Sequence, residues 1–538
     1  MKSNKMHKHT IAFLTLLLIG FGAQAQEVKK KVINWYNGAK YGMNTDAAYA
    51  KVLAGKKSET VIVAVIDSGI DIEHEDLQGH IWVNTDEVAG NGIDDDGNGY
   101  IDDVNGWNFL GNAEGENIND VRLEVTRIYA SLHPIFYGKE YGELSKEEKG
   151  NYTLYKAVKE EIEKERAEAE KELLDHQETT QALNIADKKL QNHFNGNYSK
   201  KDLKKAKKDP TIGKYAKQML ALYKLGLTYK DYNEMMGYYQ GNLDYNYNPD
   251  IDPRSEVIGD NPTDFSETNY GNNDVEGQDA GHGTHCAGII GAIRNNGIGN
   301  NGVADNVQIM SLRAVPNGDE WDKDIALAVR YAVDNGAQII NMSFGKPYSP
   351  EQAEVIKSFR YAESKGVLLV HAAGNEGLDN DDSENYPRPQ YKEMREKFSN
   401  WIEVGASTRF KKAKFYKGVY LVRDGLAADF SNYGDKMVDV FAPGHAIYST
   451  VPQSEYDVYD GTSMAGPMVA GVAALLKSYF NDLTMIEIRA IILASVQKVN
   501  ITTPLPGDPA KEITFDKLCV TGGIVNVLNA VEMAENYK

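Results

Sequence analysis

Residues 61–70 read VIVAVIDSGI, an unbroken apolar run that ends at an aspartate, a serine and a glycine. An apolar run of this length between polar residues indicates a strand that is buried on both faces, as in a parallel sheet. Similar runs recur along the chain, at residues 307–312, 338–342, 367–370, 402–404 and 437–441. Amphipathic stretches such as 322–335 and 350–365 lie between them. The pattern therefore predicts βαβ units in an α/β fold with a doubly wound, mainly parallel sheet.

One region, residues 112–270, interrupts this alternation. It is rich in lysine, glutamate and tyrosine, and an apolar stripe at helical spacing runs through residues 154–173. It also contains three capping-box patterns, at Ser145 and Glu148, Ser199 and Asp202, and Thr228 and Asp231. We expect an α-helical insertion that packs one face onto the main body. A solvated coiled coil is the alternative, but the stripe is short and diluted by alanine.

Composition limits the function classes. The chain has 538 residues, of which 42% are hydrophobic and 25% charged, so wholesale disorder and a multi-span membrane protein are excluded. A formal net charge of −20 argues against a nucleic-acid partner, because nucleic-acid binders usually carry a basic surface. The chain has two cysteines, Cys286 and Cys519, which form at most one bridge and no disulfide framework.

The first 25 residues have the pattern of a secretory signal peptide. Three lysines precede a short apolar run at residues 11–21, and Ala23-Gln24-Ala25 offers small residues to a signal peptidase. An uncleaved anchor is the alternative. We therefore expect export to the periplasm or the medium, with no membrane span in the mature chain. The expected domains are the signal peptide at 1–25, the first part of the main domain at 26–111, the insertion at 112–270 and the second part at 271–538.

Three further segments place chemically useful side chains at strand and helix ends. Asp67 ends the strand at 61–67, His282 stands between two glycines before an apolar helix, and Ser463 begins another helix. A serine hydroxyl becomes a nucleophile when an imidazole accepts its proton and a carboxylate orients that imidazole. Asn375 follows the apolar run at 367–370 and could donate its side-chain amide to an oxyanion, beside the backbone N–H at Ser463.

These segments resemble those of the subtilisin-like serine peptidases, the subtilases, in which the triad follows the order Asp, His, Ser. The resemblance covers residues 35–109 and 274–530. It implies that Asp67 orients the histidine, His282 is the general base and acid, and Ser463 is the nucleophile. It also implies a serine endopeptidase that hydrolyses proteins or peptides through an acyl-enzyme and needs no cofactor for catalysis; with the expected signal peptide, this enzyme would be exported.

The same resemblance suggests the walls of the substrate pocket, namely Ser343, Phe344 and Gly345 on one side and Ala372, Ala373 and Gly374 on the other. Both walls would bind the substrate main chain as an added strand. Residues 313–320 resemble the opposite edge of the groove. Two departures stand out: Met468 occupies a position where the family commonly has histidine, and only residues 26–60 are available for a pro-domain.

Other reactive residue types are expected to be structural. We expect His74, His285, His371 and His445 to be buried, and Cys286 to act as a small packed hydrophobe rather than a nucleophile.

Two other functions stay open: a non-catalytic scaffold that keeps the fold, and a fold whose main role is to present the insertion to a partner. The sequence does not indicate the oligomeric state.

A calcium loop is suggested by residues 94–103, which read DDDGNGYIDD. Their spacing fits the first nine positions of an EF-hand loop, whereas position twelve is Asn105 instead of glutamate. The expected ligands of a structural calcium ion are Asp94, Asp96, Asn98, Tyr100 through its carbonyl, and Asp102. A solvated acidic turn is the alternative.

Overall fold

A computed structural model describes residues 33–409, 415–416, 419–420 and 426–537. Two compact units are present: Asp120–Asp252 forms one, and the described residues of Glu27–Asn119 and Pro253–Lys538 form the other. The predicted insertion at 112–270 contains the first unit, while both of its ends belong to the second. The predicted signal peptide lies outside the described residues.

The larger unit is built on a sheet of nine strands among the described residues, in the order β12-β15-β9-β6-β5-β4-β1-β3-β2. Only the β12–β15 pair within it is antiparallel. The strands are β1 (Val61–Asp67), β2 (Gly106–Asn108), β3 (Val307–Arg313), β4 (Ile339–Met342), β5 (Leu368–Ala372), β6 (Trp401–Ser407), β9 (Val440–Pro443), β12 (Gln497–Lys498) and β15 (Gly523–Ile524). The predicted α/β fold with a mainly parallel sheet is confirmed.

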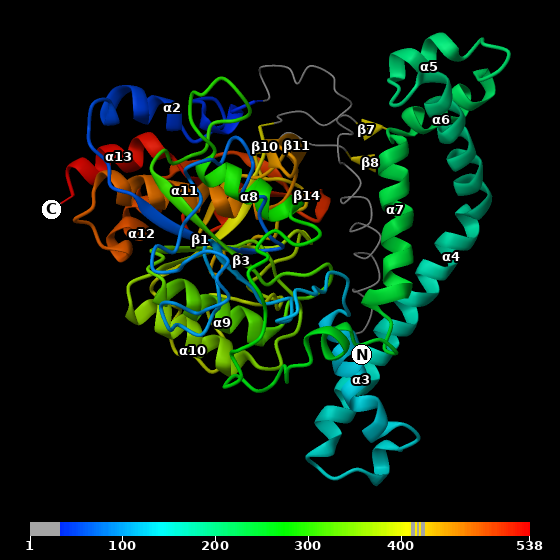
Figure 1. The fold of residues 1–538 in the computed structure, drawn as a ribbon, viewed down its shortest axis with the longest axis horizontal. Coiled ribbons are helices and arrows are strands. Elements are labelled where there is room, and N and C mark those ends of the chain that lie inside the picture. The colour runs from blue at the N-terminus through cyan, green and yellow to red at the C-terminus, as the bar shows by residue number, and fades with distance from the viewer. Residues whose placement is uncertain (1–32, 410–414, 417–418, 421–425, 538) are drawn as a thin grey trace. The chain divides into compact units, whose positions relative to one another are not determined.

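Helices cover both faces of this sheet (Figure 1). On one face, α9 (Asp322–Asp334) and α10 (Gln352–Ser364) pack against each other. On the other, α11 (Thr462–Tyr479) contacts β4, β5, β6 and β9 as well as α8 (Gly281–Gly291). Because the central strands are covered on both faces, their side chains are almost all buried, which explains their continuous apolar sequences.

Smaller elements complete this unit. The helices α12 (Met485–Ala494) and α13 (Val527–Glu535) contact α11, and α13 also contacts α2 (Thr45–Ala48). Three two-stranded ribbons join β7 (Phe415–Tyr416) to β8 (Val419–Tyr420), β10 (Ile447–Val451) to β11 (Glu455–Tyr459), and β13 (Thr502–Leu505) to β14 (Asp508–Thr514). Single helical turns are η2 (Trp35–Asn37), η3 (Tyr49–Leu53), η6 (Arg254–Ile258) and η7 (Phe515–Lys517).

The smaller unit is helical and has its own core. It contains α3 (Glu124–Phe136), η4 (Tyr141–Glu143), α4 (Glu148–Phe194), α5 (Lys200–Ala206), α6 (Gly213–Leu225), α7 (Tyr229–Gly241) and η5 (Asn242–Asn246). Buried side chains from α4, α5, α6 and α7 pack together, among them Leu190, Leu203, Met219 and Tyr232. All three expected capping boxes form. The long α4 packs on its neighbours in this unit, so it is not a solvated coiled coil.

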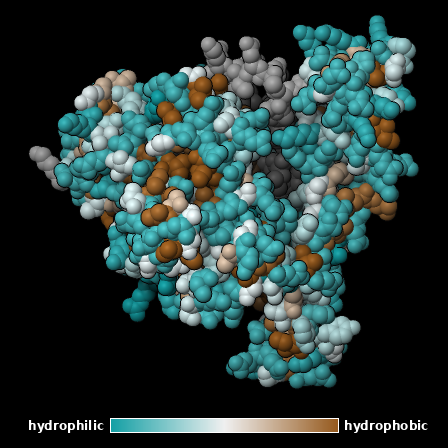
Figure 2. Space-filling view, viewed as in Figure 1, coloured by the Kyte–Doolittle hydropathy of each residue, from teal (hydrophilic) through white to brown (hydrophobic). Residues whose placement is uncertain are grey.

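The exposed surface agrees with the acidic, polar composition. Figure 2 shows a mainly hydrophilic face on which hydrophobic residues gather in small groups. Among the helices that the structure describes, none combines the length and the apolar content needed to cross a bilayer.

Candidate active site

The three expected triad residues stand at the ends of adjoining elements. Asp67 is the last residue of β1, and His282 and Ser463 are each the second residue of a helix, α8 and α11. Both helices contact β1 and each other. The carboxyl ends of parallel strands are where open α/β sheets build their sites, and this sheet follows that rule.

Asp67 and His282 form a direct pair. The Nδ1 atom of His282 lies 2.6 Å from Oδ1 of Asp67, whose side chain is buried. Since a carboxylate accepts, Nδ1 carries the hydrogen and Nε2 is left to accept a proton. Gly283 explains how α8 comes so close: a Cβ atom there would lie 2.1 Å from the carbonyl oxygen of Gly69.

The electrostatics of this pair favour a basic histidine. Burial lowers the pKa of His282, but the charges of Asp67 and Asp279 and the hydrogen bond to Asp67 outweigh it, so the pKa is raised above its ordinary value of 6.5. A raised pKa makes the imidazole a better acceptor for the proton of a nucleophile.

Ser463 is held by the segment that follows β4. Its hydroxyl donates to the carbonyl of Ser343 at 3.2 Å, and its own carbonyl accepts from the Ser343 hydroxyl at 3.0 Å. The carbonyl of Ser463 also lies 3.4 Å from Sγ of Cys286, an atom within 4.8 Å of the Asp67–His282 pair. In this resting geometry the hydroxyl therefore contacts Ser343, and attack requires it to turn towards His282.

Asn375 is oriented by the residue before the serine. Its Oδ1 accepts from the backbone N–H of Thr462 at 2.8 Å and from the Thr462 hydroxyl at 3.0 Å. With the oxygen engaged in this way, the Nδ2 group is the part of the amide that can donate to a substrate. The start of α11 and Asn375 thus present donors from two sides, as an oxyanion site requires.

The family model described as "Subtilase family" matches residues 58–510. The chain belongs to the subtilase family.

Individual relatives match over about half of this chain. The thermophilic serine proteinase of Bacillus sp. (strain AK1) is 38% identical over 48% of this chain and 55% of its own length. Thermitase of Thermoactinomyces vulgaris is 38% identical over 41% of this chain and 69% of its own length. The major intracellular serine protease of Bacillus subtilis (strain 168) is 34% identical over 48% and 75%.

The two expected substrate walls of this subtilase lie at the ends of neighbouring strands. Ser343–Gly345 follows β4, Ala372 ends β5 with Ala373 and Gly374 directly after it, and these strands pair in parallel. Gly374 has a φ of +107°, and a Cβ atom there would lie 2.4 Å from Nδ2 of Asn432, so glycine is required for both reasons.

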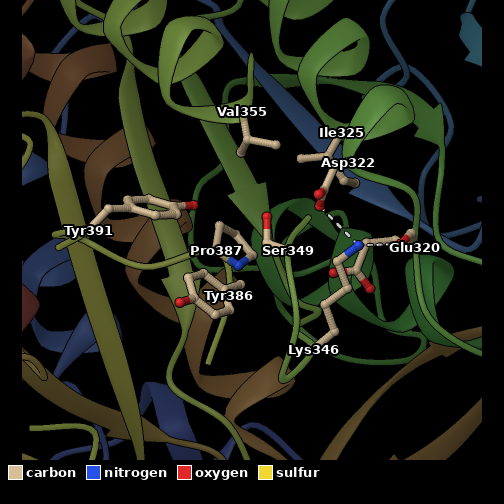
Figure 3. Close-up of a pocket in the computed structure, with 9 residues that line it drawn as sticks. All are labelled: Glu320, Asp322, Ile325, Lys346, Ser349, Val355, Tyr386, Pro387 and Tyr391. Carbon is tan, nitrogen blue, oxygen red and sulfur yellow. Dashed lines mark hydrogen bonds and ion pairs between the residues drawn. The ribbon is translucent and has the colours of Figure 1, made fainter. Parts of the chain in front are cut away.

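A pocket adjoins the first wall, lined among others by Glu320, Lys346, Val355 and Tyr386 (Figure 3). Nζ of Lys346, the residue after Gly345, donates to the carbonyl of Glu320 at 2.8 Å and pairs with Asp322 at 2.9 Å. Burial raises the pKa of the Glu320 carboxyl to about 7, against the opposing effect of Lys346. Lys346 thus links the first expected wall, at Ser343–Gly345, to the expected opposite edge of the groove at Glu320. The sequence alone did not indicate this link.

Four other histidines and Cys286 are buried, as expected, and so is Cys519. His74, His285, His371 and His445 are all buried. Burial and the neighbouring His282 lower the pKa of His285 to about 3, so it stays neutral. The described cysteines, Cys286 and Cys519, are free and buried, and burial raises the pKa of the Cys286 thiol, which keeps it protonated and a poor nucleophile.

The acidic loop differs from an EF-hand in detail. The carboxylates of Asp94 and Asp102 accept backbone N–H groups of the loop, and Asn98 accepts from the N–H of Tyr100. Asp96 alone of the five expected ligands belongs to a cluster of carboxylates, in which its partners are Glu87 and Asp103. The oxygens of these three lie within 4.8 Å of one another. Neither partner was predicted, because Glu87 lies outside the motif and Asp103 falls beside its ninth position.

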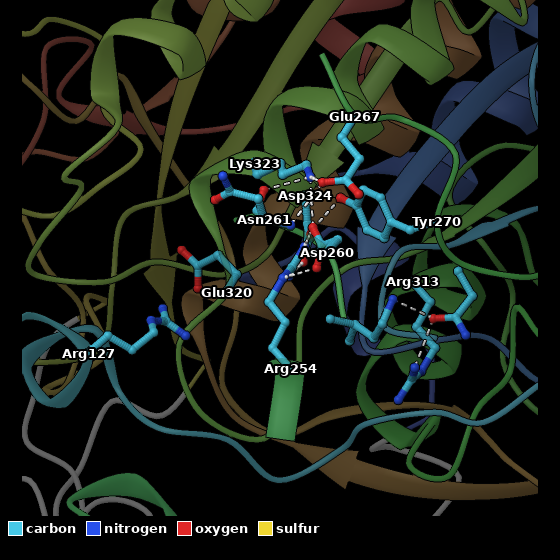
Figure 4. Close-up of polar contacts among 12 residues, drawn as sticks. Arg127, Arg254, Asp260, Asn261, Glu267, Tyr270, Arg313, Glu320, Lys323 and Asp324 are labelled. Atoms are coloured by element: carbon cyan, nitrogen blue, oxygen red, sulfur yellow. Dashed lines mark hydrogen bonds and ion pairs between the residues drawn. The ribbon is translucent and has the colours of Figure 1, made fainter. Parts of the chain in front are cut away.

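A buried ionic cluster anchors the chain where the helical unit ends (Figure 4). Arg254 forms bidentate bonds with Asp260 and Asp324, at 2.7–2.8 Å, and Lys323 donates to Asp260 at 2.7 Å. All four side chains are at most 2% exposed. The cluster joins residues 254–260 to the first turn of α9, next to the residues expected to edge the groove.

Proposed function

We propose that this subtilase is a serine endopeptidase that hydrolyses peptide bonds of proteins through an acyl-enzyme. The observation that carries the proposal is the 2.6 Å pair of His282 and Asp67 beside a serine at a helix start. Family membership supports it, and so do the names of two relatives, a serine proteinase and a serine protease.

Acylation would begin once the Ser463 hydroxyl turns from Ser343 towards His282. Oγ of Ser463 attacks the scissile carbonyl carbon while Nε2 of His282 takes the hydroxyl proton, and Asp67 stabilises the resulting imidazolium. The carbonyl oxygen becomes an oxyanion that accepts from Nδ2 of Asn375 and the backbone N–H of Ser463. When the C–N bond breaks, His282 gives its proton to the departing amine, and the acyl group stays on Ser463.

Deacylation repeats these steps with water. His282 takes a proton from the water as its oxygen attacks the ester carbon, and the same donors stabilise the second oxyanion. Collapse breaks the C–O bond to Ser463, which recovers its proton from His282, and the carboxylic acid product leaves. Each residue returns to its starting state, and every group that these steps use belongs to this chain, the substrate or water.

Labelling with a fluorophosphonate tests the assembled triad. The wild-type chain should become covalently labelled at Ser463, and the Ser463→Ala variant should not, because the probe needs an activated serine. A folded wild-type chain that resists the probe would contradict the proposal and favour a scaffold. Partner binding that is unaffected by Ser463→Ala would favour presentation of the insertion.

We further propose that the chain is exported and that its signal peptide is removed after Ala25. The lysines, the apolar run and the small residues before position 26 support this. Protein recovered from the periplasm or the medium should begin at Gln26 on N-terminal sequencing. Protein that keeps residues 1–25 in the membrane fraction would show an uncleaved anchor instead.

We also propose a structural calcium site in the acidic loop, held by Glu87, Asp96 and Asp103. Carboxylate oxygens are the ligands that Ca²⁺ prefers. Oε1 of Glu87 accepts two backbone N–H groups, whereas its Oε2 is buried without a hydrogen-bond partner. Burial, and to a smaller extent the neighbouring carboxylates, raise the pKa of Glu87 and of Asp103, and a bound cation would favour their charged forms.

Matched variants distinguish the two possible ligand sets. Glu87→Gln should lower the calcium content of the purified chain by about one ion per chain, since it removes a ligand charge. Asp94→Asn should retain the ion, because Asp94 lies outside the cluster in which the oxygens of Glu87, Asp96 and Asp103 are within 4.8 Å of one another. The reverse result would support the EF-hand spacing, and no bound calcium in any of the three proteins would show a solvated turn.

A further inference from the structure

A buried histidine and glutamate lie beneath the first substrate wall. His371 of β5 and Glu403 of β6 are register partners in the sheet, and neither is more than 2% exposed. Nδ1 of His371 is 3.0 Å from both carboxylate oxygens of Glu403. The indole N–H of Trp401 donates to Glu403 at 2.7 Å, which fixes the carboxylate from a second side.

The other ring nitrogen of His371 reaches the wall itself. Nε2 lies 2.8 Å from the carbonyl oxygen of Phe344. A carbonyl oxygen only accepts, so Nε2 must carry a hydrogen whichever group holds the proton between Nδ1 and Glu403. Glu403 thus fixes the ring plane of His371, and His371 donates to the wall.

The wall contacts the nucleophile directly. Ser343, the neighbour of Phe344, accepts the hydroxyl of Ser463 through its carbonyl and donates its own hydroxyl to the Ser463 carbonyl. The carbonyl of Ser343 thus contacts Ser463, while the carbonyl of the next residue, Phe344, contacts His371. Because consecutive peptide groups share a Cα atom, a hydrogen bond that fixes the Phe344 carbonyl also restrains the peptide groups of Ser343 and Gly345 on either side of it.

We propose that His371 is a positioning residue for peptide binding: oriented by Glu403, it holds Ser343–Gly345 in the direction that pairs with the main chain of an extended substrate. The proposal rests on the proposed endopeptidase activity. Stability alone gives little reason for this pair, because replacing a buried polar pair by apolar residues is often neutral or stabilising. The contact with a substrate wall supplies the reason.

Steady-state kinetics with long and short substrates test the proposal on the mature chain. His371→Leu removes the donor and should raise KM for a tetrapeptide anilide about three- to tenfold, the worth of one hydrogen bond, with kcat changed less. KM for a single-residue ester should stay within about twofold, since that substrate has no extended main chain to pair with the wall. His371→Gln, whose amide can donate to Phe344, should recover most of the tetrapeptide KM.

The outcomes separate the positioning role from a merely structural one. Equal changes for the long and short substrates, or no recovery in His371→Gln, would overturn the proposal. Should His371→Leu not fold, Glu403→Leu, which frees the imidazole, provides the same comparison. Fluorophosphonate labelling of the wild-type chain is the reference: failure there refutes the proposed activity, whereas labelling with unchanged tetrapeptide KM refutes only the role of His371.

Discussion

At the residue scale, the properties of His282 are set by two opposing effects. Burial disfavours its charged form, while the Asp67 carboxylate at 2.6 Å favours it, and the carboxylate prevails. A base must be neutral to accept a proton, so a raised pKa of His282 lowers the fraction of active enzyme at low pH. The enzyme should lose activity as pH falls through the pKa of His282, which lies above 6.5.

Asp67→Asn tests this balance. Without the carboxylate the pKa of His282 falls, so the rise of kcat/KM with pH should move to lower pH. At the plateau kcat should drop by about 10³- to 10⁴-fold, because an amide at position 67 stabilises the wrong imidazole tautomer. The measurement is a pH profile of kcat/KM on one peptide substrate, with Asp94→Asn as a control. A profile that keeps its midpoint would show that Asp67 does not set the pKa.

The residues that the sequence predicted are those with a local signature. Asp67, His282, Ser463 and Asn375 each stand at a strand or helix end within a short motif, and the structure brings Asp67 to His282 and Asn375 to the residue beside Ser463. The pairing of His371 with Glu403 depends on the register of two strands 32 positions apart, which no local pattern encodes. Glu87 was missed for a similar reason, since only the folded loop brings it to Asp96 and Asp103.

At the element scale, parallel pairing explains why separate segments form one site. The ends of β4 and β5 are adjacent, so the two substrate walls are adjacent as well. The continuous apolar runs were sufficient to predict these strands. They were not sufficient to predict the contacts that hold the loops in place, because these contacts involve charged residues in segments without periodicity. The ion pairs of Arg254 with Asp260 and Asp324 are an example.

Arg254→Ala should therefore destabilise the larger unit strongly. The change leaves two carboxylates, Asp260 and Asp324, buried with Lys323 as the partner of only the first, and breaking a buried ion pair costs about 3–5 kcal/mol. Urea unfolding should show a correspondingly lower free energy of unfolding. Arg360→Ala, which removes a half-exposed ion pair with Glu363, is the control and should cost less than about 1 kcal/mol. Similar losses in both variants would contradict the argument.

At the scale of the whole molecule, two units with separate cores share one chain. The helical unit begins and ends at nearly the same place, since Nη2 of Arg122 lies 2.9 Å from Oδ2 of Asp252. Its two connections to the larger unit are therefore close together. Residues 120–252 lie between Asp67 and His282 in the sequence, so this unit is inserted between two members of the triad. We infer that it restricts access of substrates or holds the enzyme inactive.

Replacing residues 120–252 by a short glycine-serine linker tests this inference. The chosen bounds keep Arg254 and Asp260, whose loss would leave buried Asp324 without a cationic partner and Lys323 without its closest carboxylate. The larger unit should fold, because its core is its own. If the insertion limits access, the deletion should raise kcat/KM for a whole protein several-fold more than kcat/KM for a short peptide. If the insertion holds the enzyme inactive, the deletion should raise kcat/KM for both substrates. The same deletion combined with Ser463→Ala is the control and should be inactive if the measured hydrolysis comes from this active site. Unchanged rates on both substrates would refute both roles, because removal of a unit that gates the site must alter at least one of them.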